Sequence, residues 1–66
     1  MRLTSTTIPN WKSDCADYAR KGEDFTLSNV ATEEHQIFCR EFCAKHNYES
    51  KPTQNPAVIE FNPKPN

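Results

Sequence analysis

The sequence predicts an α+β fold in which two helices pack on a small sheet of two or three strands, in the order β-α-(β)-α-β. Two observations lead to this prediction. Apolar residues recur at helical spacing in two separate segments, and short stretches rich in β-branched or aromatic residues flank them. A chain of 66 residues has room for one domain with a thin core, which we place at residues 1–61. The Pro/Asn-rich stretch 62–66 is expected to be a mobile tail.

The first half of the chain predicts a strand, a helix and a second extended segment. Residues Arg2 to Ile8 are rich in threonine, which is typical of a short strand at the edge of a sheet. A helix is expected to begin after Asn10 as its N-cap and to end at Gly22, the only glycine in the chain. The apolar face of this helix comprises Trp11, Cys15, Tyr18 and Ala19. In the segment that follows, Phe25 and Leu27 alternate as in a short strand.

The second half predicts a longer helix, a loop and a last strand. Thr32 is the expected N-cap, and two glutamates follow it in the first turn, where they favour the helix dipole. This helix is expected to run to about Asn47. Residues 49–56 contain two prolines and several polar residues, which indicates a loop. The β-branched run 57–61 predicts a strand.

Apolar residues lie on two sides of the second predicted helix. The wider stripe is formed by His35, Phe38, Cys39, Phe42, Cys43 and His46. The narrower stripe is formed by Ile37, Ala44 and Tyr48. Because free cysteine behaves as a small buried hydrophobe, we expect the wider stripe to pack in the core, with no cofactor and with free thiols.

Cysteine and histidine on one stripe also suggest a metal site. Residues at i and i+4 of a helix can share a tetrahedral ion, but only two successive members can reach it, since each turn advances about 5.4 Å. A zinc-stabilised domain is therefore an alternative in which Cys15, Cys39, Cys43 and His46 are the ligands. The chain has no C-x₂-C knuckle, the spacing that typifies structural zinc sites. A disulfide between Cys15 and Cys39 is expected only in an oxidising compartment.

Composition excludes several classes of function. The 8 basic and 9 acidic residues give a net charge of −1, which argues against a strongly basic surface for nucleic acid or an anionic membrane. No apolar run approaches the ~20 residues of a membrane span, and none follows the first residues as in a secretory signal. The sequence therefore predicts a cytoplasmic protein. Without a phosphate-binding loop or a nucleophile elbow, it is not expected to be an enzyme.

The narrower stripe predicts a surface for a partner, because a helix on a sheet needs only one apolar face. The expected partner-binding residues are Ile37, Arg40, Glu41, Ala44 and Tyr48. We therefore expect a small non-catalytic protein-binding module, an adaptor, inhibitor or modulator of a larger partner, of the kind that phages and plasmids encode as accessory proteins. Self-association through this surface is the alternative to a larger protein partner. Replacing Tyr48 and Ile37 together with alanine should then leave the fold largely intact but weaken partner binding or self-association.

Nucleic-acid binding through the C-terminal half of the second helix is the alternative function. The stretch "ATEEHQIFCREFCAKHNYESKPTQNPAVIEFNP" resembles the small single-stranded nucleic-acid-binding domain with an Arg-x-x-x-His signature. The resemblance covers about half of the chain: an acidic helix start, an amphipathic helix, a serine-containing loop and a β-branched strand. His35 and Cys39 stand where that family has its arginine and histidine, so no functional residue carries over. Basic side chains and Tyr48 remain as candidates for phosphate contacts and base stacking.

Overall fold

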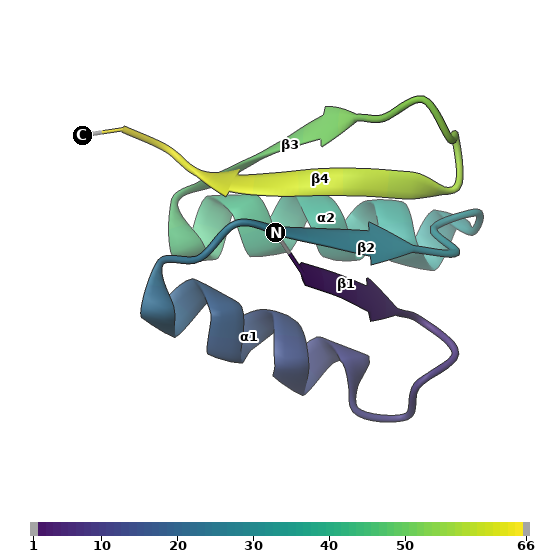
Figure 1. Cartoon of the computed structure of the whole chain (residues 1–66), viewed down its shortest axis with the longest axis horizontal. Helices are drawn as coiled ribbons and strands as arrows, with labels where there is room; N and C mark the ends of the chain where they lie inside the picture. The colour runs from purple at the N-terminus through teal and green to yellow at the C-terminus, as the bar shows by residue number, and fades with distance from the viewer. Residues whose placement is uncertain (1, 66) are drawn as a thin grey trace.

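Two helices pack against a four-stranded mixed sheet in the computed structural model, which describes residues 2–65 (Figure 1). In chain order the elements are β1 (Arg2–Ser5), α1 (Trp11–Lys21), β2 (Phe25–Ser28), α2 (Glu33–His46), β3 (Tyr48–Pro52) and β4 (Val58–Pro63). The α+β class is confirmed. The sheet has four strands, however, where the sequence predicted two or three.

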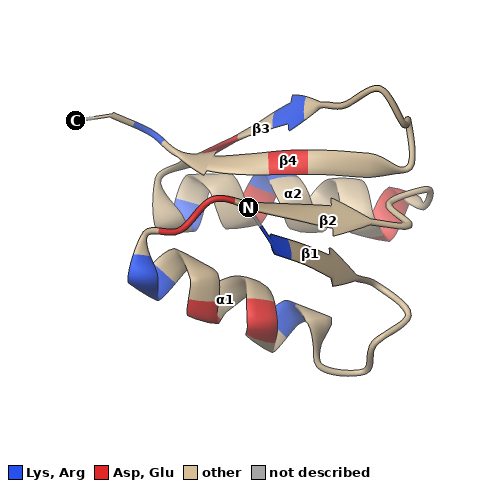
Figure 2. Ribbon diagram, in the orientation of Figure 1, with Lys and Arg blue, Asp and Glu red and all other residues tan. Residues whose placement is uncertain are grey.

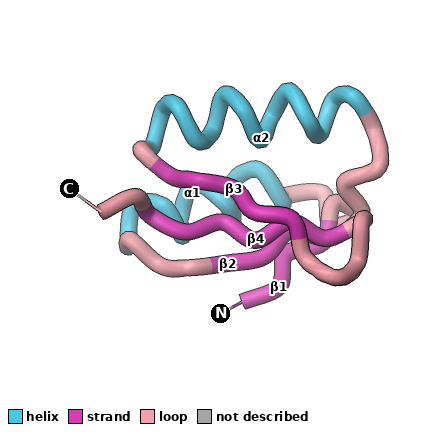
Figure 3. The backbone as a smooth tube through the Cα atoms, turned by 90° about the horizontal axis from the view of Figure 1, so that it is seen from above, coloured by secondary structure: helices cyan, strands magenta, loops and turns pink. Residues whose placement is uncertain are grey.

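The strands are arranged in the order β1-β2-β4-β3. β1 and β2 are parallel, and β4 lies between β2 and β3, antiparallel to both. In this register Phe25 pairs with Phe61, and Leu27 pairs with Ile59. Because side chains alternate along a strand, these pairs point to the same face of the sheet. β1 and β3 are the edge strands, and α2 extends along one face of the sheet (Figure 3).

Local signals place the ends of the helices. Gly22 adopts the left-handed conformation (φ 70°) that ends α1, as expected of the only glycine. The Thr32 side chain accepts a hydrogen bond from the backbone N–H of His35 and so caps α2. Asn47 also has a positive φ, 59°, and ends α2. Asn10 precedes α1 as predicted, but its side chain makes no capping hydrogen bond.

Aromatic rings dominate the core between the helices and the sheet. Phe25 and Phe61 stack with ring centroids 4.8 Å apart, and Phe42 of α2 meets both rings edge-on. Such pairs contribute about 0.5–1.5 kcal/mol each beyond their buried area. The buried apolar residues are Trp11, Cys15, Phe25, Leu27, Val30, Cys39, Phe42, Tyr48 and Phe61. The wider stripe of α2 therefore packs in the core, as the sequence predicted.

The predicted loop 49–56 is wrong in its first half, because β3 occupies Tyr48–Pro52. Prolines and polar residues had argued against a strand there. An edge strand tolerates both, since one side of its backbone has no strand to bond and Pro52 lies at its end. The predicted strand 57–61 is present, but it begins at Val58 and runs to Pro63.

The folded part of the chain also extends beyond residue 61, where the sequence placed the end of the domain. Residues 62 and 63 belong to β4, and the backbone N–H of Lys64 donates to the carbonyl of Asn47 at 2.9 Å. Lys64 is thereby held beside the C-terminus of α2. Residue 66 of the predicted tail lies outside the described residues. At the other end, the first strand closes at Ser5, earlier than the predicted Ile8.

Charged residues of both signs are interspersed along both helices (Figure 2). Within residues 2–65, none of the helices has the length and apolar character needed to cross a bilayer.

Candidate partner-binding groove

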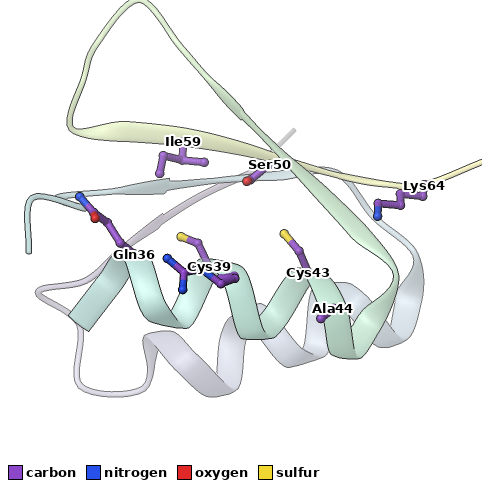
Figure 4. A pocket seen from close by; sticks show the side chains of 8 residues that line it. Gln36, Cys39, Cys43, Ala44, Ser50, Ile59 and Lys64 are labelled. Atoms are coloured by element: carbon purple, nitrogen blue, oxygen red, sulfur yellow. The ribbon is translucent and has the colours of Figure 1, made fainter. Parts of the chain in front are cut away.

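A groove runs between α2 and the β3–β4 hairpin, on the side of α2 that faces away from α1. Its volume is about 520 Å³, within the range of ligand-binding sites in proteins. Eight residues line what we call the α2–hairpin groove: Gln36, Cys39, Arg40, Cys43, Ala44, Ser50, Ile59 and Lys64. Figure 4 shows the two cysteines rising from α2 toward the hairpin, with Lys64 beyond Cys43. Five of these side chains therefore come from α2 and three from the hairpin and the residue after it.

The topology explains why the groove exists. α2 leads from β2 to β3, which lie on either side of β4, so the helix passes over the strand between them. On the α1 side, the large side chains of Phe38 and Phe42 pack toward α1 and the core. On the hairpin side the chain places small residues, Ala44 and Cys43 on the helix and Ser50 on β3. These short side chains leave the space between α2 and the hairpin unfilled.

The groove continues along the hairpin. A second hollow of about 370 Å³ shares Ser50 and Ile59 with it and extends past Pro52 to Pro56 and Val58. The two together form an open channel rather than an enclosed cavity.

The thiols on the floor of the groove differ in accessibility. Cys39 is 6% exposed, and burial, followed by the nearby Cys43, raises its pKa to about 11. Cys43 is half-buried. Burial raises its pKa too, and Glu49 adds to the effect, whereas a hydrogen bond with Ser50 and the charge of Lys64 act in the opposite direction. Both thiols are therefore protonated near neutral pH, and they present an apolar floor together with Ile59.

The charge of the groove is positive. Arg40 and Lys64 line it, and none of the lining residues is aspartate or glutamate. Among residues 2–65, neither of these two cations forms an ion pair. The carboxylate of Glu49 is close enough to affect Cys43, but it pairs with Lys51 at 3.5 Å. A chain of net charge −1 thus carries an uncompensated positive groove.

The predicted partner-binding residues do not all lie on the surface, because Tyr48 is buried. Arg40 and Ala44 line the groove, and Ile37, one turn earlier, is 44% exposed on the adjacent solvent side of α2. Glu41, one turn after Ile37 on the same outer side of α2, borders a separate hollow of about 220 Å³ between α1 and α2. Four of the five residues are therefore on the outside of α2, but only two of them face the groove.

The prediction that Tyr48 contributes to a partner-binding surface is wrong, because its side chain is only 2% exposed. It begins β3 rather than extending the stripe of α2, and its hydroxyl donates to the carbonyl of Glu23 at 2.8 Å and to that of Tyr18 at 3.2 Å. The helical wheel failed here because α2 ends at His46, before the stripe reaches Tyr48. Tyr48 is a core residue that joins β3 to the turn after α1.

Sequence reasoning missed three of the lining residues, namely Gln36, Ser50 and Ile59, and it considered Lys64 only as a basic side chain that could contact phosphates. Ser50 and Lys64 lie in segments expected to be a loop and a mobile tail. Tyr48, Ser50 and Pro52 alternate with charged residues, and this period of two was the available signal for β3. No local pattern could indicate that Lys64 lies beside α2.

The proposed metal ligands are not gathered into one site. All three cysteines are free thiols, so the disulfide considered between Cys15 and Cys39 is not formed. Cys15 is fully buried, and the His46 ring packs on Phe42 with centroids 4.6 Å apart. In the part of the chain that the structure describes, no three His, Cys, Asp or Glu side chains are grouped so as to hold a metal ion.

The nucleic-acid alternative loses its stacking residue. Tyr48 is buried, and every other aromatic side chain within residues 2–65 is buried or half-buried. Proteins that bind single strands combine a cationic groove with accessible aromatic faces. The groove meets only the first of these two requirements.

Comparisons with protein families, with curated proteins and with solved structures found no match to this chain.

Proposed function

We propose that this chain is a small non-catalytic module that binds a larger protein through the α2–hairpin groove and the adjoining outer side of α2. One observation carries the proposal: an open groove with an apolar floor that is bordered by two cations without ion-pair partners in residues 2–65. Binding sites for peptides combine apolar pockets with a few polar groups that orient the ligand.

The outer side of α2 supports the proposal. Ile37 is 44% exposed and lies one turn from Arg40 and two turns from Ala44. The apolar requirement of α2 is already met on its opposite side by Phe42 and Cys39. An apolar residue beside a groove with an apolar floor extends the surface that a partner can cover.

The test compares substitutions on this surface with a matched substitution elsewhere. Ile37→Ser together with Ala44→Gln removes apolar contact area and blocks the groove without changing charge. Leu3→Ser is the control, because Leu3 is also aliphatic and is 67% exposed on the edge strand β1. Circular dichroism checks that all variants keep the fold.

Each variant is immobilised, exposed to a lysate of the cells that encode the protein, and washed. Retained proteins are quantified by mass spectrometry, and the leading partner is purified and titrated by isothermal calorimetry. We expect the double variant to weaken binding by about tenfold or more, equivalent to about 1.4 kcal/mol, and the control to have no effect. A partner that binds the double variant as tightly as the wild type would place the interface elsewhere.

A further inference from the structure

We propose that the α2–hairpin groove takes an extended acidic segment of the partner, in which carboxylates flank one aliphatic side chain. This inference rests on the proposed function and names the chemistry of the occupant. It follows from three features of the groove: its charge, its floor and its length.

The charge of the groove selects a negative occupant. Arg40 and Lys64 are exposed and face no carboxylate within the groove. Arg40 can bind a carboxylate through two parallel N–H···O bonds, and Lys64 supplies a second positive charge beyond Cys43. Gln36 and Ser50 add neutral polar groups at the rim. A basic or neutral segment would leave both cations without partners.

The floor selects an aliphatic side chain between the carboxylates. Cys39, Cys43 and Ile59 present methylene, methyl and protonated thiol groups. A charged side chain placed there would lose its hydration without gaining a partner. A side chain of the size of valine or leucine covers this floor and leaves its neighbours in the segment free to reach the cations.

The length of the groove accommodates a short extended peptide. Gln36 and Ala44 are eight positions apart in the helix, or about 12 Å, which is the length of about four residues of extended chain. The second hollow extends this path along the hairpin past Pro52.

A second copy of this chain does not supply such a segment within residues 2–65. One acidic pair, Glu23 and Asp24, leads directly into the buried Phe25. The other, Glu33 and Glu34, lies in the first turn of α2. Neither is an exposed extended stretch with an aliphatic neighbour. The occupant therefore belongs to a different protein.

The test is selection from a library of random 12-residue peptides displayed on phage, with the intact protein as target. Selected peptides are synthesised with a fluorescent label and titrated by anisotropy. Arg40→Glu with Lys64→Glu reverses the charge of the groove. The matched control, Lys12→Glu with Lys21→Glu, makes the same change in net charge on exposed positions of α1.

We expect the selected peptides to carry aspartate or glutamate on both sides of an aliphatic residue. The groove reversal should weaken their binding by about 10- to 100-fold, whereas the α1 control should change it by less than about threefold. Exchanging the acidic residues of a selected peptide for lysine should restore binding to the reversed groove and abolish it for the wild type.

The other outcomes overturn the inference and separate it from the proposed function. Selected peptides that lack acidic residues, or that bind the reversed groove as tightly as the wild type, would show that the acidic occupant is wrong. If the same peptides lose their binding to the Ile37→Ser, Ala44→Gln variant, the groove still binds protein and the proposed function stands. If the library yields no binder, both proposals fail. A labelled single-stranded oligonucleotide is titrated in parallel. If it alone binds, with steep salt dependence, the site is one for nucleic acid.

Discussion

Tyr48 provides the sharpest test of how the chain folds around the groove. Its hydroxyl donates to the carbonyls of Glu23 and Tyr18, and its ring is buried against Phe25 and Phe42. Tyr48→Phe removes only the hydroxyl and leaves the Glu23 carbonyl without this donor. We expect it to lower the free energy of unfolding by about 1–2 kcal/mol. In a domain of this size, that corresponds to a fall in Tm of about 5–15 °C.

Tyr48→Ala should have a much larger effect. Removing a buried aromatic ring costs about 3–5 kcal/mol, which is comparable to the whole stability of about 3–10 kcal/mol for a chain of this length. We therefore expect this variant to be largely unfolded at 25 °C. This reverses the expectation from the sequence, in which Tyr48→Ala combined with Ile37→Ala left the fold largely intact.

Urea denaturation followed by circular dichroism measures all three variants, with Ile37→Ala as the control. Ile37 is 44% exposed, so its truncation should change the free energy of unfolding by no more than about 0.5 kcal/mol. A Tyr48→Phe variant as stable as the wild type would refute the structural role of the hydroxyl. A folded Tyr48→Ala variant would refute the burial of the ring.

Three further outcomes follow from the cap and the thiols. Gly22→Ala should lower the free energy of unfolding, measured by thermal denaturation, by about 1 kcal/mol, because a φ of 70° strains a residue with a Cβ even though no atom lies within 4 Å of that position. Gly22→Asn should lower it by less. Equal stability of the wild type and both variants would contradict the role of Gly22 as the cap of α1. Burial first and then nearby charges raise the pKa of Cys15 to about 12 and that of Cys39 to about 11, so the folded state keeps two protons that the unfolded chain loses above pH ~9. The contribution of these two thiols to the free energy of unfolding should be fully present below that pH and should fall by about 3 kcal/mol between pH 8 and pH 10. Cys15→Ala should halve this fall. A free energy of unfolding that does not change over this range would contradict the burial of the two thiols. Iodoacetamide at pH 8 should label Cys43 first, since it is the half-buried thiol, and peptide mapping that found Cys15 labelled as fast would contradict this order.

Much of the fold was predictable because its signals are local. Gly22 ends α1 because a left-handed residue is needed there, and Thr32 caps α2 with its hydroxyl. The alternation of Phe25 with Leu27 indicated a strand with one buried face, and both side chains are fully buried. These features depend on the nearest neighbours in the chain, which the sequence shows directly.

The local signal for β3 was weaker, consisting only of the alternation of Tyr48, Ser50 and Pro52 with charged residues. Its residues, Tyr48–Pro52, include three that are polar or charged and a proline, which are tolerated because β3 is an edge strand. Asn47, in the left-handed conformation, ends α2 where the sequence predicted the helix to end, but the apolar stripe was extended beyond it to Tyr48. Whether such a segment is a loop or an edge strand depends on β4, which lies six residues further along the chain.

The groove was predictable only in part, for a topological reason. The exposed side of α2 was visible as a surplus of apolar residues, which led to Ile37, Arg40 and Ala44. The opposite wall comes from the hairpin, and its position depends on α2 passing over β4. Lys64 reaches the groove through its backbone hydrogen bond to Asn47, which no local pattern encodes.

The most direct test of the central claim is the rate at which iodoacetamide alkylates Cys43 in the native protein, with and without a saturating acidic peptide from the selection. Cys43 lies in the floor of the groove, so a bound segment should cover it. At about ten times the dissociation constant of the peptide, we expect alkylation to slow by about tenfold, because only the unoccupied fraction reacts. An unchanged rate, with binding of the peptide confirmed by anisotropy, would contradict the claim that the α2–hairpin groove is the binding site.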